Sequence, residues 1–190
     1  MTSMSVTAST PFTVHDLEVM PDDGRRYELI DGELLVSPAP GLRHQTIAYQ
    51  LHRLLDDACP EDLYVIDAPF AVQTDVSNEV QPDVLVARFD ELTDKNLPAA
   101  PVLAVEVLSP SGRLIDLNLK RAAYQRMGTP SYWVLDPDPP DPPDLLVLEL
   151  DADGRYQEVA RVVGSEVLEA HRPFPVRIVP TELLGRLHPR

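Results

Sequence analysis

The sequence predicts a single domain of the mixed α/β class. Its 190 residues suffice for one sizeable core, and 44% hydrophobic with 25% charged residues is typical of a globular protein. The predicted elements follow in the order hairpin, helix, three strands, helix, strand and hairpin, with no internal repeat. Residues 1–11 are small and polar, so we expect a disordered leader before one domain over residues 12–190.

The predicted elements begin with a short helix and a hairpin. Thr13 and Asp16 have the spacing of a capping box, which predicts a short helix that ends before Pro21. Further on, the pair Asp31-Gly32 readily adopts the positive φ angles of a tight turn. It therefore predicts an N-terminal hairpin, with strands over residues 26–30 and 33–36.

The next segments form the expected centre of the domain, over residues 26–136. Apolar residues recur at helical spacing over residues 41–59, and the same spacing returns over residues 114–127 before the cap residue Gly128. The strands expected around these two helices cover residues 64–73, 80–88, 102–108 and 131–135.

The C-terminal third predicts an extension of the sheet. Residues 136–144 hold five prolines and four aspartates, which favours a stiff loop of polyproline geometry. Beyond this loop we expect a group of strands over residues 145–180, namely a hairpin of residues 145–150 and 155–163 and a short strand near 174–179.

Charge and cysteine content exclude several classes of protein. The net charge of −15 and a pI near 4.5 are the opposite of those of a general nucleic-acid binder. Cys59 is the single cysteine, so an internal disulfide or a cysteine zinc cage is excluded and a reducing, cytoplasmic location is expected. No apolar run approaches the roughly 18 residues that span a bilayer, and we expect no membrane partner.

Two carboxylates lie within otherwise apolar strands. Glu106 is flanked by apolar residues of a central strand, and Asp83 presents the same pattern one strand earlier. A buried carboxylate requires a partner, so a magnesium ion between the two is one interpretation. A salt bridge or a strand end open to water explains Glu106 equally well, and a turn after Pro82 explains Asp83.

Two side chains on the predicted helices are further candidates. Lys120 falls on the apolar face of the second helix, from which it would orient or help deprotonate a metal-bound water, or stabilise charge on a phosphate. Because Asp116 precedes it by four residues, an ordinary ion pair within the helix is the alternative. His44 begins the first long helix and would contact phosphate or water, or a backbone or carboxylate partner.

Several ordered motifs carry a resemblance to a known family. The chain resembles the Uma family of restriction endonucleases over about residues 12–136, with a looser match through the last strands. The motifs concerned are Tyr27-Glu28-Leu29-Ile30-Asp31-Gly32-Glu33, His44, Gln81-Pro82-Asp83, Glu106-Val107-Leu108-Ser109-Pro110, Asp116, Lys120, Tyr124 and Tyr132-Trp133-Val134-Leu135-Asp136.

This resemblance implies a restriction-endonuclease-like fold with an α-β-β-β-α-β core, which agrees with the element order read from the residues. It implies that Asp83 and Glu106 hold Mg²⁺ or Mn²⁺, and that Glu28 or Glu33 completes the acidic set. Strand alternation leaves the choice open, and the family pattern favours Glu33. Leu108 stands where the superfamily motif has lysine, and the resemblance moves the lysine to Lys120.

The sequence therefore predicts a metal-dependent endonuclease that acts on phosphodiester bonds, with DNA as the expected partner. A local excess of basic residues over 111–126 offsets part of the acidity, and a homodimer is the expected assembly. Two alternatives stay open: a catalytically silent binding or regulatory protein with the same fold, and a metal-dependent phosphoesterase for small substrates.

Overall fold

The computed structural model describes residues 11–109, 112–137 and 142–187. The leader expected over residues 1–11 lies almost wholly outside these ranges, and so does the middle of the loop 136–144. Most of the strands in the described residues belong to two sheets. The larger has six strands in the order β11-β10-β9-β8-β6-β3, and the smaller has five in the order β2-β1-β5-β4-β7.

The larger sheet contains the predicted core. Its central strands are β6 (Val84–Arg88) and β8 (Leu103–Val107), which run antiparallel, followed by β9 (Ser131–Asp136), which runs parallel to β8. At one edge β3 (Leu63–Asp67) pairs with β6. β8 is buried along its whole length, as apolar residues at both parities predict for a central strand.

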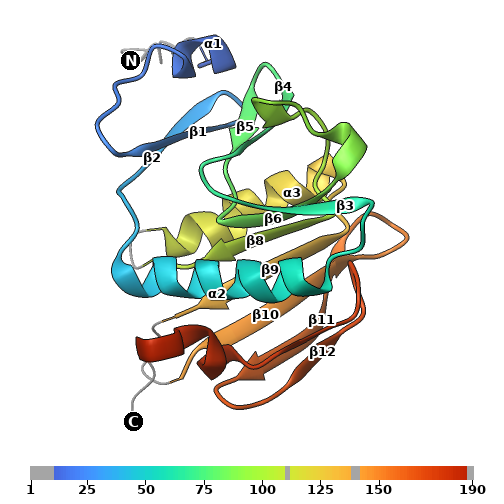
Figure 1. Ribbon diagram of the computed structural model, residues 1–190. Coiled ribbons are helices and arrows are strands. Elements are labelled where there is room, and N and C mark those ends of the chain that lie inside the picture. Colours follow the sequence, from blue (N-terminus) through green and yellow to red (C-terminus); the bar gives the residue numbers. More distant parts are fainter. Residues whose placement is uncertain (1–10, 110–111, 138–141, 188–190) are drawn as a thin grey trace, which may run out of the picture.

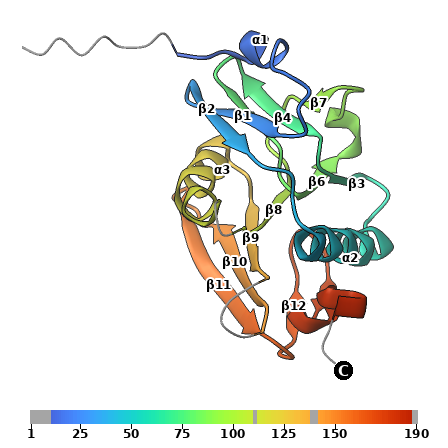
Figure 2. The ribbon, with the colours of Figure 1, turned by 90° about the vertical axis from the view of Figure 1, so that its left-hand side faces the viewer.

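Helices cover both faces of this sheet (Figures 1 and 2). On one face lies α2 (Leu42–Ala58), where Ile47, Leu51 and Leu55 are fully buried, which confirms the predicted helix and its apolar side. On the other face lies α3 (Arg121–Met127), which ends at Gly128 with a left-handed φ of 83°. Each helix packs on its own hydrophobic cluster, so the sheet separates two cores.

The second predicted helix has an unexpected first half. Residues Ile115–Lys120 form a π-helix that leads directly into α3. A π-turn contains an extra residue, and such turns are frequent at functional sites because they rotate side chains away from the regular helical positions. Apolar spacing does not distinguish a π-turn from an α-turn, so the sequence predicted an unbroken α-helix here.

Two predicted strands are each divided between the two sheets. The segment 64–73 is β3 and then β4 (Ala71–Asp75), because the chain leaves the larger sheet at Ala68 and Pro69. The segment 80–88 is the end of β5 (Asn78–Val80) and then β6, separated at Pro82. Proline cannot donate a ladder hydrogen bond, which accounts for a break at each position.

The smaller sheet begins with the predicted hairpin. β1 (Arg26–Ile30) pairs with β2 (Glu33–Ser37) through a turn in which Asp31 and Gly32 both have positive φ. Beside it the predicted capping box opens α1 (Val14–Leu17), in which Thr13 N donates to Asp16 Oδ2 at 2.7 Å. At the other edge of this sheet β4 pairs with β7 (Asn96–Leu97).

The first two C-terminal strands extend the larger sheet as predicted, whereas the last two form a separate two-stranded sheet that packs on α2. β10 (Asp144–Leu150) pairs with β9 and with β11 (Tyr156–Val163), which confirms the predicted hairpin. The short strand expected near residues 174–179 is β13 (Val176–Ile178), and its partner is β12 (Leu168–Ala170). The final 3₁₀ turns Pro180–Leu187 and a 3₁₀ turn at Phe89–Glu91 complete the described elements.

Candidate active site

The candidate site lies where the smaller sheet meets the larger one. Its residues come from β1, from the starts of α2 and β6, from the end of β8 and from the π-helix. Val84 of β6 is paired with Val105 of β8, so one step further along the ladder Asp83 stands beside Glu106. The two carboxylates are 4% and 2% exposed. The structure therefore brings together the pair that the sequence singled out.

Asp83 is held by three donors. Arg26 Nη1 lies 2.9 Å from its Oδ1, while His44 Nε2 and the backbone N–H of Val107 lie 3.0 and 2.8 Å from its Oδ2. Burial alone would raise the pKa of Asp83. The hydrogen bond from His44 and the nearby positive charges outweigh burial and lower the pKa to about 2, so this carboxylate is ionised.

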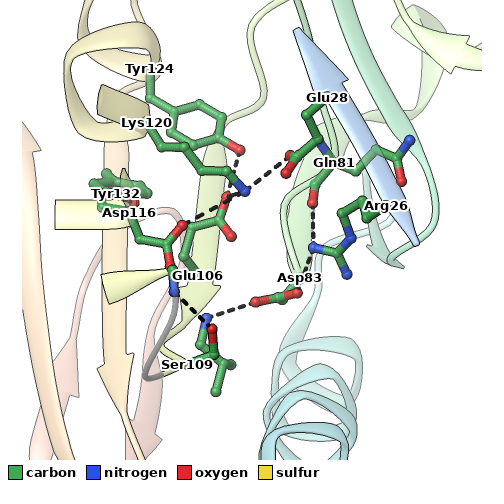
Figure 3. Close-up of polar contacts among 12 residues, drawn as sticks. Arg26, Glu28, Gln81, Asp83, Glu106, Ser109, Asp116, Lys120, Tyr124 and Tyr132 are labelled. Carbon is green, nitrogen blue, oxygen red and sulfur yellow. Dashed lines mark hydrogen bonds and ion pairs between the residues drawn. The ribbon is translucent and has the colours of Figure 1, made fainter. Parts of the chain in front are cut away.

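Lys120 lies among three carboxylates (Figure 3). Its Nζ is 3.0 Å from Glu28 Oε1, 3.1 Å from Glu106 Oε1 and 3.8 Å from Asp116 Oδ1. Burial favours the neutral amine, but these carboxylates outweigh it and raise the pKa of Lys120 above its ordinary value. Lys120 therefore keeps its positive charge within the cluster.

The hairpin glutamate that reaches this group is Glu28, which corrects the preference for Glu33. Glu28 is 1% exposed, and its Oε1 also accepts a 2.7 Å hydrogen bond from Gln81 N. Glu33 is exposed on β2, where it pairs with Ile30 across the turn. β1 is the inner strand of the hairpin and β2 its outer edge, so a residue of β1 faces the site.

Glu106 has a second donor at the same oxygen. Tyr124 Oη donates to Glu106 Oε1 at 3.0 Å, and both side chains are buried. Burial raises the pKa of Glu106 well above its ordinary range, and the neighbouring carboxylates raise it further, although Lys120 opposes them. This carboxyl group therefore retains a proton far more readily than Asp83 does.

The π-helix brings a fourth carboxylate, Asp116, to the cluster. Its backbone carbonyl accepts a 2.9 Å hydrogen bond from Tyr132 Oη, and a Cβ at Gly112 would lie only 3.1 Å from its Oδ2. Burial raises the pKa of Asp116 to about 6, with Lys120 opposing this shift. The predicted ion pair with Lys120 is present, but it is buried within the site and is not a solvated helix contact.

A pocket of about 420 Å³ opens onto these groups. Its wall carries the four carboxylates together with Arg26, Arg43, His44 and Lys120, and its remaining lining includes the segment 37–42 before and at the start of α2. Arg43 donates to the backbone carbonyl of Pro137 at 3.1 Å. The pocket therefore combines acidic groups on its inner wall with several cationic ones.

The charges of the described cluster suit a divalent cation. Four buried carboxyl groups face the two permanent cations Arg26 and Lys120. With all four carboxyl groups ionised the cluster has an excess of two negative charges, and a bound cation would favour that state because it opposes the raised pKa values of Glu106 and Asp116. Within the ranges that the structure describes, no three histidine, cysteine, aspartate or glutamate side chains are grouped to hold a metal. Mg²⁺ is commonly bound by one or two carboxylates, with waters and substrate phosphates as its other ligands. Asp83 and Glu106 meet that requirement.

The sequence did not identify Arg26, and it assigned no site role to Asp116. Arg26 shares the strand parity of Glu28, so strand alternation was a signal that would have placed both on one face. The expected basic patch over residues 111–126 is not a continuous surface. Arg126 pairs with Asp31 at 2.6 Å, Arg113 pairs with Asp136, and Lys120 is buried.

The mixed sheet between two helices, with paired carboxylates at the ends of β6 and β8, defines a protein of the restriction-endonuclease-like class. The chain belongs to the Uma2 family, described as "Putative restriction endonuclease", whose model matches residues 14–182. This confirms the family resemblance and the predicted fold.

A solved structure from Anabaena variabilis ATCC 29413, titled "a putative nuclease belonging to DUF820", has a TM-score of 0.68 with this chain at 18% identity. The match covers 93% of this chain and 99% of that one. No curated protein matches the chain. Among the helices of the described residues, none has the length and apolarity required to cross a membrane.

Proposed function

We propose that this protein is an endonuclease that uses Mg²⁺ or Mn²⁺ to hydrolyse phosphodiester bonds in DNA. The observation that carries the proposal is the pairing of Asp83 and Glu106 on the wall of a pocket, beside a buried Lys120. Membership of a family described as restriction endonucleases supports the nuclease activity. The metal requirement and the DNA substrate rest on the chemistry of the site.

Each residue has a distinct role in this proposal. Asp83 and Glu106 hold the cation, which supplies Lewis-acid stabilisation of the phosphodiester when bound. Lys120 directs its positive charge at the phosphate and balances Glu106. Glu28 and Asp116 position Lys120, because both carboxylates contact its ammonium group. His44 keeps Asp83 in place through a 3.0 Å contact with its Oδ2.

The net charge of −15 opposes the approach of DNA over distances comparable to the Debye length of about 8 Å at physiological salt. The cations of the pocket act at shorter range, where Arg26, Arg43 and Lys120 face the same cavity. We therefore expect weak and strongly salt-dependent binding of DNA, with most of the affinity from contacts inside the pocket.

The test is cleavage of supercoiled and single-stranded DNA with Mg²⁺ or Mn²⁺ by the wild type, Asp83→Asn and Glu106→Gln. Cleavage by the wild type that both substitutions abolish supports the proposal. Metal binding by the wild type without cleavage of any nucleic acid or small phosphoester contradicts it and favours a silent binding protein. Cleavage of small phosphoesters alone assigns the same site to the phosphoesterase alternative.

A further inference from the structure

We infer that Arg26 competes with the divalent cation for Asp83, and that the phosphodiester relieves this competition by binding the guanidinium group itself. The inference rests on the proposed function, because it concerns the same metal site. It adds a regulatory property to that function: metal and substrate would each bind more tightly in the presence of the other. Arg26 is then a positioning residue for the metal ligand before substrate arrives, and a substrate contact afterwards.

Both carboxylate oxygens of Asp83 already accept hydrogen bonds. Its Oδ2 already accepts from two donors, His44 Nε2 at 3.0 Å and Val107 N at 2.8 Å. Its Oδ1 faces Arg26 Nη1 at 2.9 Å, and the same nitrogen donates to Gln81 O at 3.0 Å. A cation that approaches Oδ1 therefore meets the guanidinium group first, and the two positive charges repel each other.

Arg26 is held by fewer contacts than Lys120, the other cation of the cluster. The Lys120 side chain is 5% exposed and contacts three carboxylates, whereas that of Arg26 is 19% exposed and pairs with one. Arg26 also lines both the main pocket and a second cavity of about 130 Å³, so there is unfilled space beside its present position. Displacement of Arg26 costs fewer contacts than displacement of Lys120.

The Arg26 guanidinium group can release Asp83 only by moving, because it does not lose its charge. A guanidinium group keeps its charge at every pH that a protein tolerates, so Asp83 is released only if the side chain swings away. A phosphate is the natural acceptor, since it takes two parallel N–H donors from arginine in the same way as a carboxylate does. A phosphodiester in the main pocket would therefore draw Arg26 from Asp83 and expose Oδ1 to the metal.

The decisive measurement is calorimetric titration of Mn²⁺ into the full-length wild type, Arg26→Gln and Arg25→Gln. Arg25 is the matched control, because it is the adjacent residue and its loss changes the net charge equally. Its side chain is 60% exposed and pairs with Asp23 outside the pocket. We expect Arg26→Gln to bind Mn²⁺ roughly tenfold more tightly than the wild type or more, while Arg25→Gln binds as the wild type does.

The second arm repeats the titrations in the presence of a short phosphorothioate DNA duplex that resists cleavage. We expect the duplex to tighten Mn²⁺ binding to the wild type about fivefold or more, and to have little effect on Mn²⁺ binding to Arg26→Gln. Arg26→Lys retains the charge with a single point of contact, and should show an intermediate affinity without the duplex. This variant also provides the comparison if Arg26→Gln fails to fold.

The outcomes separate the inference from the proposed function. Equal Mn²⁺ affinities of the wild type, Arg26→Gln and Arg26→Lys overturn the inference, while loss of binding in Asp83→Asn would still support the metal site. No Mn²⁺ binding by the wild type or by any of the Arg25 and Arg26 variants overturns both, and so does Mn²⁺ binding that Asp83→Asn leaves unchanged. Tighter Mn²⁺ binding by Arg26→Gln, with Arg25→Gln at the wild-type affinity and binding lost in Asp83→Asn, supports both.

Discussion

Glu28 and Lys120 join the two sheets of the molecule through a buried ion pair of 3.0 Å. Glu28 belongs to β1 of the smaller sheet, and Lys120 ends the π-helix that packs on the larger one. Neither residue is more than 5% exposed, so the pair is shielded from salt and water. The position of the Lys120 ammonium group beside Glu106 thus depends on how the N-terminal hairpin packs.

Substitution of Glu28 by glutamine should lower nuclease activity strongly, whereas Glu33→Gln should leave it unchanged. The amide keeps the hydrogen bond to Gln81 N but removes the charge that fixes Lys120, and loss of a positioning charge in a preorganised site costs on the order of 10²-fold. Initial rates of plasmid nicking measure this. Equal losses in both variants would contradict the assignment of Glu28 as the site residue.

Lys120→Met should destabilise the metal-free protein by about 3–5 kcal/mol, because it leaves buried carboxylates without their cation. The double variant Lys120→Met with Glu28→Gln should recover part of this loss, since it removes one of those carboxylates. Urea unfolding in EDTA measures the wild type, both single variants and the double variant. Arg126→Ala is the control: its pair with Asp31 is exposed and should contribute no more than about 1 kcal/mol. If the effects of Lys120→Met and Glu28→Gln on the unfolding free energy are additive, Lys120 and Glu28 are not coupled.

Tyr132→Phe should lower both stability and activity, whereas Tyr156→Phe should lower stability alone. Both hydroxyls are buried and donate to a backbone carbonyl, Tyr132 to Asp116 at 2.9 Å and Tyr156 to Thr129 at 2.8 Å. Each loss should cost about 1–2 kcal/mol of unfolding free energy. Only the Tyr132 bond holds the π-helix, so only its loss should shift Asp116 and Lys120. Unchanged nicking rates in Tyr132→Phe would exclude this role.

Glu79 should make the protein less stable as the pH rises above about 4.5. This half-buried residue of β5 has a raised pKa, chiefly because of burial and then because of the charges of Glu18 and Glu28. A raised folded-state pKa means that stability present at low pH is lost as the group ionises. Glu79→Gln should therefore match the wild type at pH 4 and exceed it by roughly 0.5 kcal/mol at pH 7, after solvent screening is considered.

Thermal unfolding of both proteins across this pH range provides the measurement. Glu158→Gln, a substitution at an exposed position of β11, is the control and should change stability at neither pH. If Glu79→Gln is more stable than the wild type by the same amount at pH 4 and pH 7, the stabilisation does not come from the ionisation of Glu79.

Much of the fold follows from local pattern, because hydrophobic periodicity and turn residues act over short stretches. The capping box at Thr13, the turn at Asp31-Gly32, the apolar face of α2 and the cap at Gly128 are all present where the sequence predicts them. The division of residues 64–73 and 80–88 between two sheets was missed, since alternation along one strand carries no information about its neighbours.

The site residues also fall into two groups, those that the sequence singles out and those that it does not. Asp83, Glu106 and Lys120 stand out in the sequence because each is a charged residue in an apolar pattern. Arg26 follows another arginine, and Asp116 has the spacing of an ordinary helical ion pair with Lys120, so the sequence assigned neither a site role. Tertiary packing brings both to the wall of the pocket. The preference for Glu33 over Glu28 was wrong for a related reason, since the inner and outer strands of a hairpin are equivalent until the hairpin packs on something.

Between β3 and β6 the chain leaves the larger sheet and forms β4 and β5 in the smaller sheet, which affects how the pocket is built. Arg26 and Glu28 belong to the smaller sheet, whereas Asp83 and Glu106 lie at the ends of β6 and β8 in the larger sheet. No strand is shared between the two sheets. The width of the pocket therefore depends on the apolar contact between the two sheets, in which Ile30, Val72 and Val80 pack with Leu85 and Tyr124. A slight tilt of the smaller sheet on the larger one would widen or narrow the pocket while every strand pairing stays intact.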